Sequence, residues 1–269
     1  SDIIYLGKNK FTCWRNLSGN SFSTTPFEID PFPEINSQSK LTATDLLGNG
    51  VACIVWSSPL PKGSNAPLKY IDLMNSKKPH IMVSYKNNLG KEVSLEYAPS
   101  TKFYLEDKKA GKPWITKLHF PVHCLVKVKI KDKWRNSEFT NSYSYHHGYY
   151  DHAEHEFRGF GRVEQVDTEL FGEFTKRNAS GDNISDDHTL YQPPVKTITW
   201  HHTGAFLNRE KILSQFSEEY FPNWFEALRP DEENVLGSCR ENKLPELDLE
   251  GTDLTTEEWR EALRACKGM

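Results

Sequence analysis

The segment Val122–Arg135 places apolar and basic side chains at alternate positions. Apolar residues take the even positions from Val122 to Ile130, and basic residues take the odd positions from Lys127 to Arg135. Because successive side chains of a strand point to opposite faces, a period of two predicts one long strand with a buried face and a solvated face. The aromatic content of 12% favours the same class, so the chain is predicted to be mainly β.

Short strands and turns are expected throughout the first part of the chain. Strands are predicted at Ile3–Leu6 and Phe11–Asn16, whereas the prolines of residues 26–37 predict a loop. Residues 41–56 predict a hairpin in which two strands are joined by a tight turn at Asn49–Gly50.

The middle of the chain is predicted to be a run of antiparallel strands. The Ser, Pro and Gly composition of residues 57–67 indicates a linker and a domain boundary. Residues 80–97 predict a second hairpin whose connection contains Gly90, a residue that tolerates positive φ. We expect residues 68–166 to be mainly strands, followed by a long polar loop over residues 172–194.

The last part of the chain is predicted to be helical. Apolar residues recur at helical spacing over residues 206–221. A final helix is expected over residues 255–267, because Thr255 and Glu258 form the pattern of a capping box. The acidic residues 231–258 between the two helices predict a solvated connector.

Composition excludes several classes of protein. The net charge of -4 argues against general nucleic-acid binding. The five cysteines are scattered and odd in number, which indicates free thiols rather than a disulfide framework. No apolar run approaches the roughly 20 residues that span a bilayer, and the first residues show no signal peptide. The chain stops just past a helix, so we expect it to be a piece of a longer polypeptide.

One candidate ion site lies in the hairpin of residues 41–56. Asp45 and Asn49 supply oxygen ligands of the kind that calcium prefers, at alternating positions of the loop. Leu47 and Cys53 stand where further oxygen ligands would be needed. A structural hairpin without metal is therefore the favoured interpretation.

A second candidate is a group of histidines at His146, His147, His152 and His155. Zinc binds histidine and carboxylate, and acidic residues lie among them. In an extended segment, however, His146 and His147 would point to opposite faces. We therefore predict no metal ligand among these residues.

Nucleophilic catalysis is not indicated. Ser57, Ser100 and Ser180 are expected in loops, outside any Gly-x-Ser-x-Gly elbow. Cys124 lies on the apolar face of a strand, where a thiol is inert. The glycines of residues 157–161 lack the Lys-Ser/Thr of a phosphate loop. The prediction is a protein that is not an enzyme, with no catalytic, cofactor-binding or metal-binding residue.

Several motifs carry a family resemblance. Residues 41–56 resemble one FG-GAP-type propeller repeat whose calcium-loop acids are partly missing. Residues 96–104 and 112–122 resemble the B component of bacterial insecticidal toxin complexes, also called TcdB or TcB, and so do residues 143–151 and 156–163. The SpvB N-terminal region belongs to the same family. The Tyr-x-Tyr of residues 143–145 and the Gly-Arg-Val of residues 161–163 together also resemble an Rhs repeat, which is also called a tyrosine-aspartate (YD) repeat.

The resemblance implies an architecture. Residues 1–60 would be the terminal blade region of an FG-GAP-type β-propeller. Residues 61–269 would be the first part of an antiparallel Rhs-type β-hairpin shell, with a helical insertion near residues 206–267. One repeat cannot close a propeller of typically 4–8 blades, which again indicates a piece of a longer chain. Such a shell would enclose a chamber, and whether the basic face of Lys127–Arg135 lines that chamber or faces solvent stays open.

The resemblance also implies a function in virulence. In the family, the shell and the C component encapsulate a cytotoxic effector, and the propeller docks onto the pore-forming A component. The partners implied are therefore the C component with its effector and the A component, without nucleic acid or direct membrane insertion. The protein would be made in the bacterial cytoplasm and act outside the cell as part of a secreted toxin.

Two other classes remain open. A secreted β-rich adhesion or carbohydrate-binding module would explain exposed Trp and Tyr side chains, and glycan binding would identify it. A metal-dependent hydrolase would use the histidines, and bound zinc in the purified protein would identify it.

Overall fold

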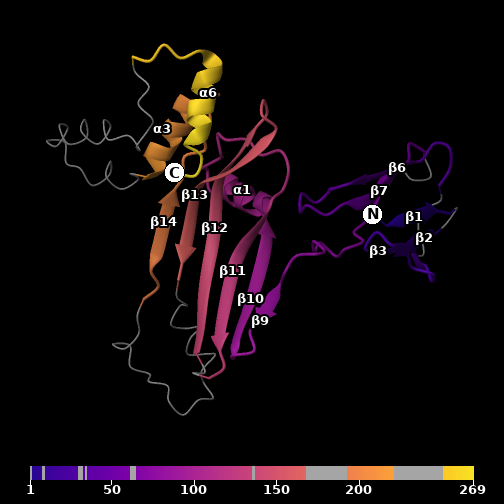
Figure 1. Cartoon of the computed structure of the whole chain (residues 1–269). Helices are drawn as coiled ribbons and strands as arrows, with labels where there is room; N and C mark the ends of the chain where they lie inside the picture. The colour runs from indigo at the N-terminus through magenta and orange to yellow at the C-terminus, as the bar shows by residue number, and fades with distance from the viewer. Residues whose placement is uncertain are drawn as a thin grey trace. The chain divides into compact units, whose positions relative to one another are not determined.

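The computed structural model describes residues 2–7, 10–29, 33, 35–60, 65–134, 137–167, 193–220 and 251–269. Strands account for most of the secondary structure, and all strand pairs are antiparallel. The chain divides into two compact units, Ser1–His80 and Ile81–Met269. Figure 1 shows the strands of each unit as separate sheets.

The first unit contains two three-stranded sheets and a short hairpin. One sheet has the strand order β1-β2-β5, the other has the order β6-β7-β8, and the hairpin is β3-β4. The strands are β1 (Ile3–Leu6), β2 (Phe11–Trp14), β3 (Asn16–Leu17), β4 (Ser21–Phe22), β5 (Phe27–Ile29), β6 (Lys40–Thr44), β7 (Cys53–Ser57) and β8 (Leu68–Ile71). Both sheets contribute to one core of Phe11, Cys13, Ile54 and Trp56.

Three features of the first unit differ from expectation. β5 lies within the loop expected over residues 26–37, because its three residues pair with β2 between the prolines. The hairpin of β6 and β7 is confirmed, but residues 45–52 connect its strands where a tight turn was expected. β8 pairs with β7, so the compact division follows His80 and not residue 60.

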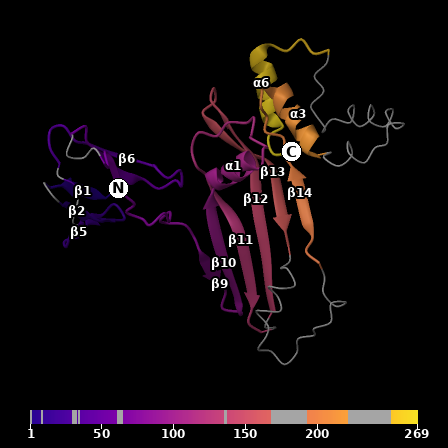
Figure 2. The same cartoon turned by 180° about the vertical axis from the view of Figure 1, so that it is seen from behind.

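The second unit is built on a six-stranded sheet with the order β14-β13-β12-β11-β10-β9. Its strands are β9 (Ser84–Lys86), β10 (Lys91–Pro99), β11 (His123–Asp132), β12 (Ser137–Asp151), β13 (Glu156–Val166) and β14 (Lys196–Trp200). The predicted hairpin through Gly90 is confirmed as β9-β10, with a φ of 91° at Gly90. The sheet is open, with β9 and β14 at its two edges (Figure 2).

The charged side chains of β11 face acids and hydroxyls on neighbouring strands. In the register of β11 with β10, Lys127 lies opposite Glu96, Lys131 opposite Glu92 and Lys129 opposite Ser94, while the ion pairs of Glu92 are with Lys86 and Lys133. Most residues of β11 are half-buried on both faces, so the expected contrast of a buried and a solvated face holds only in part. The lysines are accommodated because β10 supplies opposite charge on the same face.

The described part of this unit has three helices in addition to the sheet: α1 (Ser100–Lys109), α3 (Arg209–Tyr220) and α6 (Thr256–Ala265). The two predicted helices are confirmed as α3 and α6, and α6 begins with the predicted capping box at Thr255. α1 was not predicted from the sequence. Most of the loop expected over residues 172–194 and of the acidic connector expected over residues 231–258 lies outside the described residues.

α6 and the residues directly after it are joined to the hairpin of β12 and β13 by ion pairs. The Leu263 side chain is fully buried, and its carbonyl oxygen lies close to Gly204, in the segment after β14. Arg260 pairs with Glu154, and Lys267 pairs with Glu156 at 2.8 Å. The helical tail is therefore an integral part of the second unit. Among the described helices, none is long and apolar enough to cross a membrane.

Candidate functional site

A group of buried and half-buried charged side chains in the second unit surrounds His146 and His147, two of the four histidines considered from the sequence. Six side chains form what we call the polar cluster: Asp107, His146, His147, Arg162, Glu164 and Glu219. They come from α1, β12, β13 and α3. The cluster thus joins two helices to the centre of the long hairpin.

The first part of the cluster connects α1 to β12. The Nδ1 atom of His146 lies 2.6 Å from the Oδ2 atom of Asp107, and the same oxygen accepts a hydrogen bond of 2.6 Å from the indole of Trp114. Burial raises the pKa of Asp107, but the hydrogen bonds from His146 and Trp114 outweigh it and hold the pKa below its usual value. Asp107 is therefore stabilised as a carboxylate.

The second part of the cluster connects α3 to β12 and β13. The Nε2 atom of His147 lies 2.9 Å from Glu219, and Arg162 bridges Glu219 at 2.5 Å and Glu164 at 2.8 Å. Burial raises the pKa of Glu219, but His147 and Arg162 outweigh it and hold the pKa below its ordinary value. Burial likewise raises the pKa of Glu164, and there Lys196 and Arg162 outweigh it and lower the pKa.

The two histidines reach one network because β12 is irregular at this point. His147 has a φ of 58°, and the register with β13 shifts between Gly148 and Tyr150. The positive φ departs from the extended conformation at His147 itself, so the alternation expected for an extended segment is interrupted there. The expectation that the two rings would be kept apart on opposite faces is therefore wrong.

The polar cluster is buried and its charged groups are joined by ion pairs, although the buried His146 Nε2, His147 Nδ1 and Arg162 Nε atoms have no hydrogen-bond partner in the part of the chain that the structure describes. The His147 side chain is 1% exposed and that of Glu219 is 9% exposed. The Ser144 hydroxyl donates a hydrogen bond of 3.4 Å to Glu164. Within the described residues, no group of three or more His, Cys, Asp or Glu could hold a metal ion. The arrangement anchors helices to the sheet.

Aromatic rings and glycines surround the polar cluster. His147 contacts Phe216 with ring centroids 4.9 Å apart, and Trp200 contacts Phe216 at 5.3 Å. A Cβ atom added at Gly161 would lie 2.2 Å from the Phe216 ring, and one at Gly148 would lie 2.9 Å from Leu118. Both glycines are therefore required by close packing of α3 and of the segment after α1.

The other two histidines considered as metal ligands, His152 and His155, lie away from the polar cluster, at the end of the hairpin of β12 and β13. His152 stacks on His119 with centroids 5.2 Å apart and an interplanar angle of 26°. His155 occupies the turn with a φ of 53°. The structure therefore divides the four histidines among three settings.

The remaining sequence candidates have structural partners. Asp45 accepts hydrogen bonds from the backbone of Asn49 and Gly50 at 3.0 and 2.7 Å, and so shapes its own loop. Burial raises the pKa of Cys124 to about 12, so its thiol stays protonated. Ser100 begins α1 and accepts a hydrogen bond from the backbone of Val122. Ser180 lies outside the described residues.

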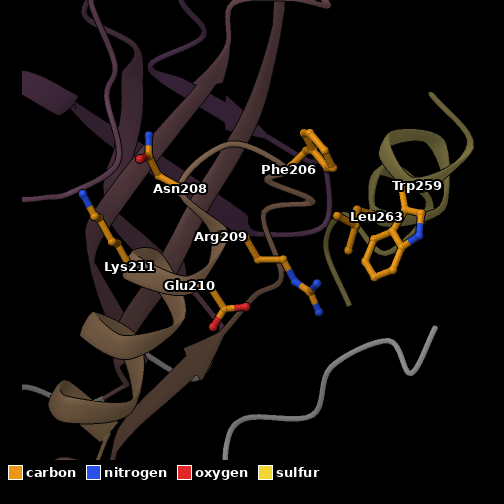
Figure 3. Close-up of a pocket in the computed structure, with 7 residues that line it drawn as sticks. All are labelled: Phe206, Asn208, Arg209, Glu210, Lys211, Trp259 and Leu263. Carbon is orange, nitrogen blue, oxygen red and sulfur yellow. The ribbon is translucent and has the colours of Figure 1, made fainter. Parts of the chain in front are cut away.

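A surface groove of about 350 Å³ lies between α3 and α6. Figure 3 shows Arg209 directed toward Trp259, and the guanidinium carbon lies 5.6 Å from the ring centroid. The groove is lined by Phe206, Asn208, Arg209, Glu210, Lys211, Trp259 and Leu263. It contains a cation–π pair and one acid, without a nucleophile and base in contact.

Sequence reasoning missed the partners of the histidines. Asp107, Arg162 and Glu219 were not singled out, although each contributes an ion pair within the polar cluster. Arg162 stands in the Gly-Arg-Val motif that carries part of the resemblance. That motif and the candidate pair His146 and His147 were therefore the signals in the sequence that pointed to the cluster.

The family comparison gives one match over most of the chain. A family model described as the insecticide toxin TcdB middle/N-terminal region matches residues 20–186. No protein in the curated set matches.

Solved structures of toxin complexes contain similar chains. A Photorhabdus luminescens Tc holotoxin pore contains a chain with 26% identity and a TM-score of 0.68 over 100% of this chain. A TcdB2-TccC3-TEV crystal structure gives 30% identity and a TM-score of 0.62 over 79%. A TcdB2-TccC3 crystal structure gives 24% identity and a TM-score of 0.67 over 100%, which supports the fold alone.

This chain corresponds to a small part of those proteins. It covers 11%, 9% and 12% of the three matched chains, respectively.

Proposed function

The chain belongs to the family of the insecticide toxin TcdB middle/N-terminal region, and from this premise we propose that it is a non-catalytic, structural part of a toxin-complex B component. The observation that carries the proposal is the family match over residues 20–186, which runs through both units. A B component acts in a secreted toxin, so we place the assembled protein outside the bacterial cell.

The first unit supports the assignment to a propeller. Its two sheets are each three-stranded and antiparallel, and β6-β7-β8 follow one another in chain order as in a propeller blade. All four residues of β1 are exposed although all four are apolar. We propose that this unit continues into neighbouring blades of the longer protein, which cover such surfaces, and that the propeller docks onto the A component.

The second unit supports the assignment to a shell wall. Its strands are consecutive and antiparallel, the central four are long, and among the described residues β9 and β14 form the two edges of the sheet. An open sheet with free edges requires closure or partners. We propose that the sheet is part of an Rhs-type shell that encapsulates the effector together with the C component.

The polar cluster fits a role in containment. It buries charged groups inside the wall and pairs them with one another, so it strengthens the attachment of α1 and α3 without presenting a reactive group. Buried ion pairs are costly to break once formed, because removal of one partner leaves an unpaired charge. The geometry supports a mechanical function and not catalysis.

Co-expression of the full-length protein with its C component tests the proposal. The effector should co-purify and resist added protease until the complex is denatured. A variant with Gly161→Val, which forces Phe216 away from the sheet, should expose the effector. A variant with Glu257→Ala, at an exposed residue of α6, serves as the control and should retain protection. A full-length protein that binds no C component and protects no effector would refute the proposal.

A further inference from the structure

The loop between β6 and β7 contains the one Asn-Gly pair of the 269-residue sequence, Asn49–Gly50. Asn-Gly is the dipeptide most prone to spontaneous deamidation, because glycine has no side chain to obstruct attack by its own backbone nitrogen. Both residues are half-buried rather than fully enclosed. Water and hydroxide can therefore approach this pair in the folded protein.

The reaction needs no partner other than water. The Gly50 nitrogen loses its proton to hydroxide and attacks Cγ of Asn49, so that a nitrogen–carbon bond forms as the bond from Cγ to Nδ2 breaks. The amide nitrogen leaves as ammonia after taking a proton from water. One water molecule then opens the cyclic imide, giving an aspartyl or an isoaspartyl residue.

Asp45 opposes the first step of this reaction. Its Oδ2 atom accepts the Gly50 N–H at 2.7 Å, and its Oδ1 atom accepts the Asn49 N–H at 3.0 Å. The proton that must leave is thus held by a charge-assisted hydrogen bond. Its loss would also create a negative nitrogen beside a carboxylate, which Coulomb repulsion disfavours.

The Asn49 side chain is restrained at the same time. Its Oδ1 atom accepts a hydrogen bond of 2.9 Å from the backbone of Val51, a buried residue. Rotation of the amide toward Gly50 would break this bond. The attacking nitrogen and the carbon under attack are therefore each engaged elsewhere in the loop.

We propose that Asn49–Gly50 is a latent deamidation site and that Asp45 is the positioning residue that keeps it closed. An isoaspartyl residue at position 49 would add a methylene group to the backbone of the loop. Thr44 and Cys53 flank this loop and pair with each other across the hairpin of β6 and β7. Trp56 lies in the same strand as Cys53 and belongs to the core of the first unit. Deamidation would accordingly loosen the first unit.

The experiment follows deamidation of the whole chain in mildly alkaline buffer by peptide mass spectrometry with isoaspartyl detection. Asp45→Ala should raise the rate at residue 49 by about tenfold or more, as expected for loss of a charge-assisted hydrogen bond. Asp45→Asn, which keeps an acceptor but loses the charge, should give an intermediate rate. Asn49→Gln should abolish the conversion, and wild type unfolded in urea sets the unprotected rate.

Leu47→Ala is the matched control, because Leu47 is an exposed residue of the same loop. It should react at the wild-type rate. The proposal is overturned if native wild type reacts as fast as the unfolded chain, if Asp45→Ala reacts no faster than wild type, or if Leu47→Ala accelerates equally. Should Asp45→Ala fail to fold, the comparison of Asp45→Asn with native wild type decides in the same way.

Discussion

The two units reach their folded states by different means. The first unit depends on a small apolar core of Phe11, Cys13, Ile54 and Trp56, between two short sheets. The second unit adds the polar cluster, where helices from distant parts of the chain are joined to the sheet by ion pairs. The comparison shows that sheets with similar antiparallel pairing can be secured by apolar packing in one case, and by apolar packing together with buried charge pairing in the other.

Both units also leave large apolar side chains exposed. In the first unit, Tyr5 is 63% exposed and Leu68 is 52% exposed, and in the second unit Trp134 is 83% exposed and Leu89 is 79% exposed. The packing at the polar cluster is tight, because a Cβ atom added at Gly161 would lie 2.2 Å from the Phe216 ring. The exposure of apolar residues is therefore common to the two units, and the buried charge pairing is what distinguishes the second.

The largest effect is expected from Phe11→Ala. Phe11 is fully buried, so the change should destabilise the first unit by about 3 to 5 kcal/mol. Hydrogen exchange with peptide resolution should show faster exchange in β2 and β7 and unchanged exchange in β12 and β13. Phe22→Ala serves as the control, since Phe22 is 43% exposed and its loss should have little effect. Equal loss of protection in both units would show that they fold as one.

The next effect is expected in the second unit from Gly161→Ala. The added methyl group would overlap the Phe216 ring, and overpacking of this kind costs about 1 to 3 kcal/mol. The thermal midpoint of the second unit should fall while the first unit is unaffected. Combination with Phe216→Leu should cost less than the sum of the two single changes, because the residues are in contact. Strict additivity would contradict the packing described for Gly161.

Acid should affect the second unit through its buried carboxylates. The pKa values of Asp107, Glu164 and Glu219 are lowered in the folded state. Groups with lowered pKa values stabilise the fold above their unfolded values near about pH 4, and this contribution is lost as pH falls through the folded values. Denaturant unfolding followed from neutral pH downward should show this loss.

Glu219→Gln provides the control for the acid effect. It removes one titrating group but keeps a side chain of the same shape beside His147 and Arg162. The variant should be less stable at neutral pH by about 2 kcal/mol, because the buried side chains of His147 and Arg162 would no longer have a carboxylate as their partner. Its stability should also depend less steeply on acid pH than that of wild type, and an identical slope would rule out Glu219 as a contributor.

The smallest effect is expected from Thr255→Ala. The Thr255 side chain accepts a hydrogen bond from the backbone of Glu258 and completes the capping box of α6. Loss of this cap should cost about 1 kcal/mol of local helix stability. Hydrogen exchange over residues 256–266 should become faster, with little change in α3. Unchanged exchange in that segment would argue against the cap.

Much of the fold could be predicted from the sequence, because these elements depend on residues that are close together in the chain. Alternating side chains and Gly or Asn at the turns predicted the hairpins β6-β7 and β9-β10, and the capping box predicted α6. α1 was missed because it follows Pro99 with no side-chain cap and with few buried residues on its face. β5 was missed because prolines surround its three residues.

The polar cluster could not be predicted from local sequence patterns, because the residues that form its ion pairs are distant in the sequence. His146 pairs with a residue 39 positions away, and His147 with one 72 positions away. The histidines were noticed, but their expected placement on opposite faces assumed a regular strand, and the positive φ at His147 interrupts the alternation there. Topology, and not composition, determines which charges meet.

Electron cryomicroscopy of the full-length protein assembled with its C component tests the central claim most directly. We expect a closed, hollow shell in which the six-stranded sheet from β9 to β14 forms part of the wall, with effector density inside. We also expect the first unit to lie within a complete propeller. A six-stranded sheet that stands outside any enclosed chamber, with its edges at β9 and β14 free, would contradict the account.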